Sequence, residues 1–152
     1  MRTTTDHEDR SGPSHLTVRP WWDPTLAVAG FDPRSAYAER FWLPVVGPST
    51  LLLLRRFARG LEEHPTGFRV SLADTGRALG LGSGTGRTSP VNRTIERACT
   101  FGLARRVDTD SIEVRSHLPR LAPRQLDRLP PVLRRAHRDY LVRAAPELPP
   151  AA

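Results

Sequence analysis

Apolar side chains in the middle of the chain recur at helical spacing. Between Leu51 and Leu61 they follow one another at intervals of three and four residues, which places them on one side of a helix. This pattern predicts an amphipathic helix over about 50–63, with Ser49 or Thr50 as its N-cap. The arginines between the apolar positions would face solvent, so we expect this helix to belong to the core.

Shorter elements follow this helix. Alternating polarity at 68–70 predicts a short strand, and Ser71 followed three residues later by Asp74 is a capping box for a helix that ends near Leu79. Glycine then occupies every second position from 80 to 86, a composition too flexible for a helix. We therefore expect a glycine-rich loop over 80–87.

A further helix is predicted over about 90–101. Ser89 can cap its first turn, and Gly102 can end its last turn in the left-handed conformation. Two short strands at 103–107 and 111–115 would then pair as a hairpin around an Asp-Thr-Asp turn. The predicted order in this part of the chain is helix, strand, helix, loop, helix and hairpin.

The N-terminal third is less regular. Residues 1–17 are polar, and we expect them to be disordered. Residues 18–48 carry aromatic side chains between prolines and glycines, which predicts an irregular segment held to the core by its rings, then a short helix from Asp32 to about Trp42. An alternative is that the tryptophans of this segment form a platform on which nucleic-acid bases stack.

The C-terminal part is rich in arginine. An amphipathic helix is predicted within 121–143, interrupted or kinked at Pro130 and Pro131, and residues 144–152 are expected to be a disordered tail. If the chain forms a homodimer or binds a protein partner, we expect the contact to involve this helix or the N-terminal aromatic residues.

Charge indicates a polyanion as the partner. The chain carries 23 basic residues, all of them arginine, against 16 acidic ones, for a net charge of +7 and a pI of about 11.2. A G+C-rich genome explains the use of arginine in place of lysine, but it does not explain the excess of positive charge. Such an excess is typical of nucleic-acid binding, with a membrane surface as the second possibility.

Other classes of function find no support in the sequence. Cys99 and the five scattered histidines have no metal-ligand spacing, and we interpret Cys99 as a buried, inert thiol. No nucleophile lies in a recognisable motif with a histidine and an orienting acid, so we expect neither enzymatic activity nor a cofactor. Because no apolar segment is long enough for a signal peptide or a bilayer span, the sequence predicts a cytoplasmic protein. Of the two polyanions we prefer nucleic acid, and we expect no membrane partner.

Two short motifs resemble those of winged helix-turn-helix DNA-binding domains. Leu72–Leu81 is similar to the first helix and turn of that motif, and Phe101–Arg106 is similar to the passage from its recognition helix into the wing. The resemblance implies a mainly α (α+β) fold with a winged helix-turn-helix domain at 49–120, a short β-hairpin wing, an extra N-terminal segment and a C-terminal helix. The glycines make the turn longer than is usual in the family, and Asp108 and Asp110 would repel phosphates at the wing tip.

The helix at 90–101 is the candidate contact element. A projection at about 100° per residue places Val91, Ile95 and Ala98 on the inner side and arginine, glutamate and threonine side chains on the outer side. Arginine can bond to guanine or phosphate, threonine to a base edge, glutamate to the cytosine amino group and asparagine to adenine. The alternative is an ordinary solvated face on which Glu96 pairs with Arg93 or Arg97. With neighbouring loop and strand residues, the predicted DNA-binding set is Arg87, Thr88, Ser89, Asn92, Arg93, Glu96, Arg97, Thr100, Arg105, Arg106 and Arg115.

The glycine-rich loop does not match a nucleotide-binding motif. Leu81 stands where a Walker A motif requires its first glycine, and Arg87 replaces the lysine. A dinucleotide fingerprint fails because no strand precedes the loop. The free backbone N–H groups could instead hold a DNA phosphate at the start of the next helix. We expect the loop to be mobile in the free protein and ordered on DNA, with a passive connector as the alternative.

These observations lead to one preferred function and two alternatives. The preferred interpretation is a transcriptional regulator that reads double-stranded DNA with the helix at 90–101. The second is a replication or plasmid-maintenance initiation factor, because Phe41–Pro48 is similar to a stretch of the N-terminal winged helix of primosomal initiation proteins. The third is a winged-helix module that binds another protein.

Overall fold

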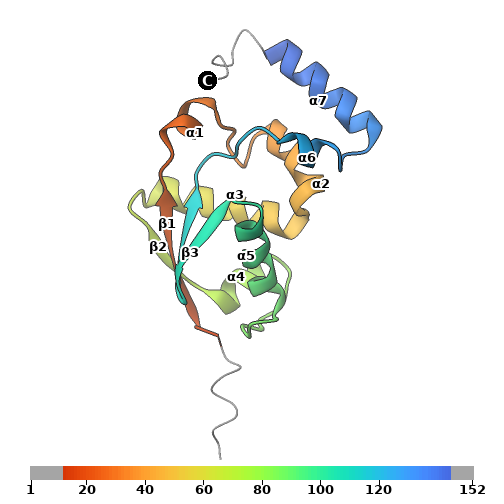
Figure 1. Ribbon diagram of the computed structural model, residues 1–152. Helices are drawn as coiled ribbons and strands as arrows, with labels where there is room; N and C mark the ends of the chain where they lie inside the picture. The colour runs from red at the N-terminus through yellow and green to blue at the C-terminus, as the bar shows by residue number, and fades with distance from the viewer. Residues whose placement is uncertain (1–11, 145–152) are drawn as a thin grey trace, which may run out of the picture.

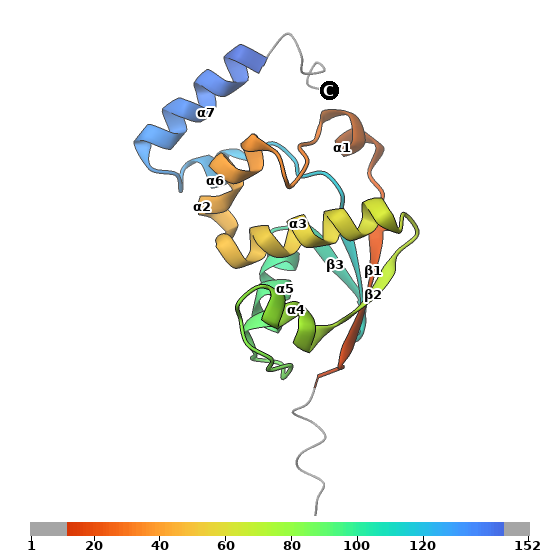
Figure 2. The same ribbon diagram turned by 180° about the vertical axis from the view of Figure 1, so that it is seen from behind.

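The computed structural model describes residues 12–144 and shows a mixed α+β fold. A four-stranded sheet carries helices on one face, and the C-terminal helix projects beyond one end of this body (Figures 1 and 2). None of the helices within residues 12–144 is long and apolar enough to cross a membrane.

The expected disorder of 1–11 and 145–152 concerns residues outside the described part of the chain. The elements are β1 His15–Trp21, α1 Pro24–Ala29, η2 Ala38–Trp42, α2 Leu43–Val46, α3 Pro48–Glu63, β2 Phe68–Ser71, α4 Leu72–Ala78, α5 Pro90–Thr100, β3 Ala104–Asp108, β4 Ser111–Arg115, α6 Pro123–Leu126 and α7 Pro131–Ala144.

The N-terminal strand β1 lies inside the sheet. The strand order is β2-β1-β4-β3, with β1 antiparallel to β2 and parallel to β4, and with β3 and β4 forming an antiparallel hairpin. Leu16 and Val18 are buried in the core, whereas Thr17 and Arg19 alternate with them on the opposite face. Helix α3 crosses the face that carries the buried residues (Figure 2).

The predictions of disorder up to residue 17 and of an irregular segment beyond it are therefore wrong for β1. The alternation that marks a strand covers only a few residues here, and Pro20 interrupts it. Proline has no N–H to donate to a ladder, so it argues against a strand inside a sheet. The pairing partners are β2 and β4, far along the chain, and no local pattern indicates them.

The helical region before α3 starts later and extends further than predicted. Asp32 does not cap this helix, because the helical segment begins later, where the N–H of Ala38 donates to Ser35 Oγ (3.3 Å). The Asp32 carboxylate instead accepts hydrogen bonds from the backbone N–H of Arg34 (2.7 Å) and from the guanidinium of the same residue (3.0 and 2.9 Å). The π-helical segment η2 then leads directly into α2, and the N–H of Leu43 donates to the carbonyl of Ala38. Pro44 lies in the first turn of α2, where its missing N–H is tolerated, so the helix does not end at Trp42.

The predicted N-cap of α3 is also wrong. The helix begins at Pro48, and Gly47 occupies the N-cap position at a φ of +85° without a side-chain hydrogen bond. Proline suits the first helical position because its fixed φ is helical and its missing N–H would have no partner there. Ser49 and Thr50 consequently lie within the first turn of the helix.

The elements from β2 to β4 agree with their predictions to within one or two residues. Ser71 Oγ accepts a hydrogen bond from the N–H of Asp74 (3.2 Å), and Ser89 Oγ accepts one from the N–H of Asn92 (3.4 Å). Gly102 follows α5 at a φ of +71°. Local capping signals therefore set the limits of α4 and α5. The predicted interruption of the C-terminal helix separates α6 from α7.

An aromatic cluster holds α7 to the body. The Tyr37 hydroxyl accepts a hydrogen bond from the N–H of Leu121 (2.9 Å) and lies 2.8 Å from His137 Nε2. The rings of Phe41 and Tyr140 pack around this pair. Burial raises the pKa of Tyr37 to about 12, so its hydroxyl stays protonated at neutral pH while it shares a hydrogen bond with His137 Nε2.

The inner face of α5 should carry much of the stability of this fold. Ile95 is fully buried, with an exposed fraction of 0%. We expect Ile95→Ala to lower the free energy of unfolding by about 2–5 kcal/mol, because it removes buried methyl groups and leaves a cavity. Chemical denaturation would measure this change. A value equal to that of Thr100→Ala, on the exposed face, would contradict the assignment of the inner face.

The stability of the α7 contact should depend on pH through His137. Burial lowers the pKa of His137 below its ordinary value of 6.5, with nearby Arg120 adding to the effect. Between these two values the unfolded chain binds a proton that the folded protein does not, so stability falls as the pH drops through 6.5. Urea unfolding at about pH 7.5 and about pH 5.5 would show this loss. His137→Gln, which does not titrate, should reduce the difference; an unchanged difference would exclude His137 as its source.

Candidate nucleic-acid interface

Helix α5 divides into an inner and an outer face as predicted. Val91, Ile95 and Ala98 are buried against the sheet and α3, together with Thr94. The side chains of the outer face are exposed and consist of Arg93, Glu96, Arg97 and Thr100. The predicted separation of the two faces is confirmed, but several of the outer side chains already have partners within the protein.

Asn92 was predicted to contact DNA from the start of α5, but its side chain is buried and bonded within the protein. It is 7% exposed, and its amide Nδ2 donates hydrogen bonds to the carbonyl oxygens of Thr85 (2.9 Å) and Gly86 (2.8 Å). These bonds fasten the end of the glycine-rich loop onto the first turn of α5. In this structure the amide group is therefore not free to bond to adenine, and Asn92 positions the loop instead.

The other end of the glycine-rich loop is also fixed. The N–H of Leu81 donates to the carbonyl of Gly76 (2.8 Å), and Gly80 and Gly82 have positive φ values of +73° and +80°. A Cβ on Gly76 would lie 2.5 Å from the carbonyl oxygen of Gly82, so α4 and the loop can approach this closely only with glycine at 76. Mobility of the loop in the free protein remains a prediction. A large movement of the loop would have to break the contacts between Gly76 and residues 81 and 82.

Arg97 connects α5 to the end of α2. Its Nε donates to the carbonyl of Val46 (2.6 Å), one NH2 group donates to the carbonyl of Val45 (3.3 Å), and the guanidinium lies 5.5 Å from the centre of the Phe101 ring. Carbonyls at the C-terminal end of a helix lack intrahelical partners, so an arginine there satisfies them. Arg97 thus has a structural role that the sequence pattern did not indicate.

Glu96 and Thr100 also make internal contacts. Glu96 Oε1 accepts a hydrogen bond from Arg106 Nε at 2.5 Å, which joins α5 to β3. The Thr100 hydroxyl donates to the carbonyl of Glu96 (2.9 Å). The predicted alternative, in which Glu96 pairs with Arg93 or Arg97, is therefore wrong about the partner.

The remaining strand arginines of the predicted set, Arg105 and Arg115, are bound around Trp21. Arg115 Nη1 pairs with Asp23 (2.9 Å), its Nε donates to the carbonyl of Gly102 (2.9 Å), and its guanidinium lies 3.7 Å from the centre of the Trp21 ring. Arg105 lies 4.3 Å from the same ring and pairs across the hairpin with a glutamate of β4. Trp21 is therefore covered by two arginines and does not form an open stacking platform.

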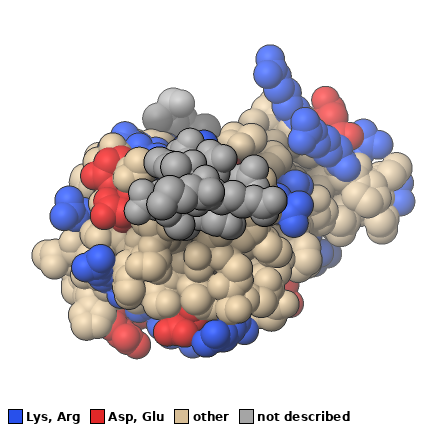
Figure 3. Space-filling view, turned by 90° about the horizontal axis from the view of Figure 1, so that it is seen from below, with Lys and Arg blue, Asp and Glu red and all other residues tan. Residues whose placement is uncertain are grey.

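Three of the predicted residues remain exposed and lack a partner within residues 12–144. These are Arg87 and Thr88 in the loop and Arg93 in the first turn of α5. Ser89 is half-buried and caps the helix. The two free arginines lie beside the N-terminus of α5, where the helix dipole adds positive potential. Figure 3 views the molecule from its lower end, where basic and acidic side chains are both scattered over a largely uncharged surface.

The tip of the hairpin is acidic. A hydrogen bond between the two carboxyl side chains lowers the pKa of Asp108 and raises the pKa of Asp110. Both residues are exposed, so the tip carries negative charge at neutral pH. A phosphate backbone would be repelled there, so the hairpin tip is an unfavourable place for an anion to approach.

Cys99 lies beside this interface without the features of a reactive thiol. It is half-buried on the flank of α5, and burial raises its pKa. A raised pKa keeps the sulfur in its protonated, weakly nucleophilic form at neutral pH.

Comparison of the chain with protein-family models, with curated proteins and with solved structures finds no match. The function of this interface therefore has to be inferred from its own geometry and charge.

Asn92→Ala should loosen the glycine-rich loop while α5 stays folded. The substitution leaves the carbonyls of Thr85 and Gly86 without their donor. We expect faster amide hydrogen exchange across 80–88 and a loss of about 1–3 kcal/mol in the free energy of unfolding. Thr100→Ala, which removes only a hydrogen bond within the helix, is the matched control. Equal exchange in the two variants would show that Asn92 does not restrain the loop.

Proposed function

We propose that the protein binds double-stranded DNA as a winged helix-turn-helix protein and regulates transcription, with α5 as the recognition helix. The succession of α3, β2, α4, α5 and the β3–β4 hairpin supports this proposal, because it is the element order of that domain type. The observation that carries it is a pair of exposed arginines, Arg87 and Arg93, that have no side-chain partner within residues 12–144 and lie at the start of a helix whose opposite face is buried.

The division of the arginines into free and bound side chains supports a specific mode of binding. A guanidinium without an internal partner can form bidentate hydrogen bonds to guanine or phosphate. Arg97, Arg106 and Arg115 hold α5 and the hairpin in place through contacts within the protein. Their role in binding would then be to hold the contact surface rigid, which lowers the entropic cost of association.

The start of α5 is the part that enters the major groove in this proposal. N-terminal residues of recognition helices commonly contact base edges. Arg93 is in that position, and Thr88 and Arg87 directly precede the helix, where they would bond to a flanking phosphate. The acidic residues at the hairpin tip make insertion of the wing into a DNA groove unfavourable. In this proposal the glycine-rich loop, and not the wing, contacts the DNA phosphate backbone.

The double variant Arg87→Ala/Arg93→Ala tests this mode of binding. We expect each lost contact to weaken binding by about 1–3 kcal/mol, and each lost phosphate contact to reduce the slope of log K against log salt by about 1. Fluorescence anisotropy on a site selected from random duplexes, at several salt concentrations, would measure both quantities. The unfolding free energy should not change, since both side chains are exposed.

Arg56→Ala/Arg59→Ala is the matched control. It removes the same charge from exposed positions of α3, which is outside the proposed interface. Equal weakening by the two double variants would show that only net charge matters. Failure of the parent protein to bind any duplex at low salt would overturn the proposed function itself.

A further inference from the structure

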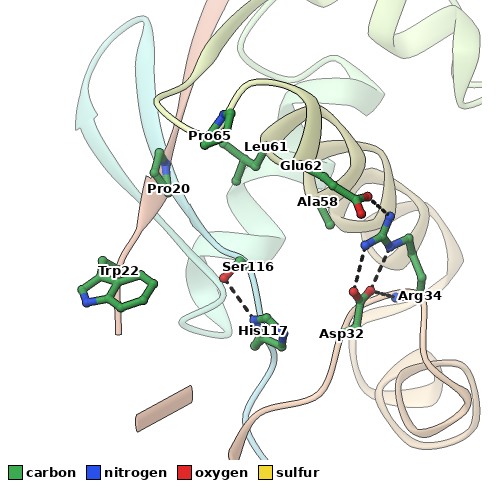
Figure 4. A pocket seen from close by; sticks show the side chains of 10 residues that line it. All are labelled: Pro20, Trp22, Asp32, Arg34, Ala58, Leu61, Glu62, Pro65, Ser116 and His117. Atoms are coloured by element: carbon green, nitrogen blue, oxygen red, sulfur yellow. Dashed lines mark hydrogen bonds and ion pairs between the residues drawn. The ribbon is translucent and has the colours of Figure 1, made fainter. Parts of the chain in front are cut away.

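A concave surface lies away from the α5 interface. It is a pocket of about 450 Å³ bordered by the C-terminal half of α3, the end of β1 and the segment that follows β4 (Figure 4). No residue of α4, α5 or the glycine-rich loop lines it. Its volume is within the range typical of small-molecule sites.

The walls of the pocket are mainly apolar. Pro20, Leu61 and Pro65 lie along one side, and Trp22, a residue that is 72% exposed, stands at the edge (Figure 4). Neighbouring Trp21 is covered by two guanidinium groups, whereas Trp22 is not covered by any ring or guanidinium in the described part of the chain. The exposed indole therefore offers a flat apolar surface, and also a π face, to a molecule in the pocket.

The opposite wall carries a cluster of charges. The Arg34 guanidinium bonds to both oxygens of Asp32 (3.0 and 2.9 Å) and to Glu62 Oε2 (2.6 Å). The hydrogen bonds from Arg34 hold the pKa of Asp32 below its ordinary value, so that carboxyl is ionised at neutral pH. Two carboxylates face one guanidinium, which leaves a net negative charge in a chain whose total charge is +7.

The hydrogen-bonding capacity of this wall favours a donor on the ligand. The bonds to Asp32 and Glu62 use three of the five N–H groups of the guanidinium, one on each nitrogen, and place two carboxylates against its single positive charge. Glu62 Oε1 has no hydrogen-bond partner among residues 12–144, so it can accept from a ligand. An anionic ligand would meet this carboxylate, whereas a cation would be attracted both by the carboxylate and by the indole face.

We propose that this pocket, formed by Trp22, Leu61, Pro65 and the Asp32–Arg34–Glu62 cluster, binds a small organic cation with an ammonium or amidinium group on an apolar body. The apolar body packs against Trp22 and the prolines, and the cationic group bonds to Glu62. This binding site is separate from the α5 interface and does not depend on DNA binding. It gives a role to the exposed indole, which contributes little to the core.

The proposal predicts selective binding of phenethylammonium over two molecules of matched size, phenethyl alcohol and phenylacetate. The indole N–H signal of Trp22 in a ¹H–¹⁵N NMR spectrum is the direct readout. The signal of Trp42, whose indole donates to the carbonyl of Pro119 (2.8 Å) in the core, is an internal reference. We expect a saturable shift for the ammonium with a Kd on the order of 1 mM, a weaker one for the alcohol and none for the carboxylate.

Two variants and one control connect that shift to the pocket. Glu62→Gln should weaken binding about tenfold through loss of a charge-assisted hydrogen bond. Trp22→Ala should abolish binding as followed by the backbone amides of Ser116 and His117, which border the site. Val28→Ala, at a position that is 73% exposed and outside the pocket, should bind like the parent. Thermal midpoints would verify that all three variants are folded.

Each alternative result overturns the proposal. Equal shifts with phenylacetate would show nonspecific contact of an aromatic ring, and a linear, unsaturated response to phenethylammonium would show that no site exists. Unchanged affinity in Trp22→Ala would place binding elsewhere. Because no DNA is present in the titration, these outcomes are independent of whether α5 binds DNA.

Discussion

The position of β1 between β2 and β4 is the constraint on which the rest of the structure depends. Strand β2 is bonded to the sheet only through β1, and the hairpin reaches β2 only across it. Leu16 and Val18 of this strand are buried in the core beneath α3. Removing β1 would therefore divide the sheet and expose the face of α3 that packs on it.

The same strand connects the two candidate sites. Just before β1, a Cβ on Gly12 would lie 3.0 Å from the carbonyl of Thr85 and 3.7 Å from the amide of Asn92, so the chain passes directly beside the glycine-rich loop. Just after β1, Trp22 borders the pocket. A rigid strand of seven residues thus has the proposed DNA interface at one end and the proposed cation site at the other. Such an arrangement can couple two sites only if the strand shifts in register or position, and its pairing on both sides opposes such a shift.

The sequence predicted those features whose causes are local. The caps at Ser71, Ser89 and Gly102 involve only backbone groups a few residues away. The helical spacing of apolar residues in α3 and α5 likewise lies within the helices that it predicts. The location of β1 depends on partners elsewhere in the chain, and so do the partners of Arg97 and Arg115. A helical projection identifies which side chains face away from the core, but it does not identify the residues of other elements that they contact.

This difference matters most for the arginines, because the proposed function gives one residue type two roles: some arginines would contact DNA, and others bond to groups within the protein. An arginine bonded to carbonyls or carboxylates of the protein has already lost part of its hydration and rotamer freedom, and reaching DNA would require those bonds to break. A free arginine such as Arg93 has no such bonds to lose. Substituting a bound arginine would disturb the placement of α5 while leaving the number of phosphate contacts largely unchanged, whereas substituting a free one would change that number directly. Affinity alone would not distinguish these two effects. The slope of log K against log salt would, because it depends on how many phosphates the protein neutralises and not on how rigidly the arginines are held.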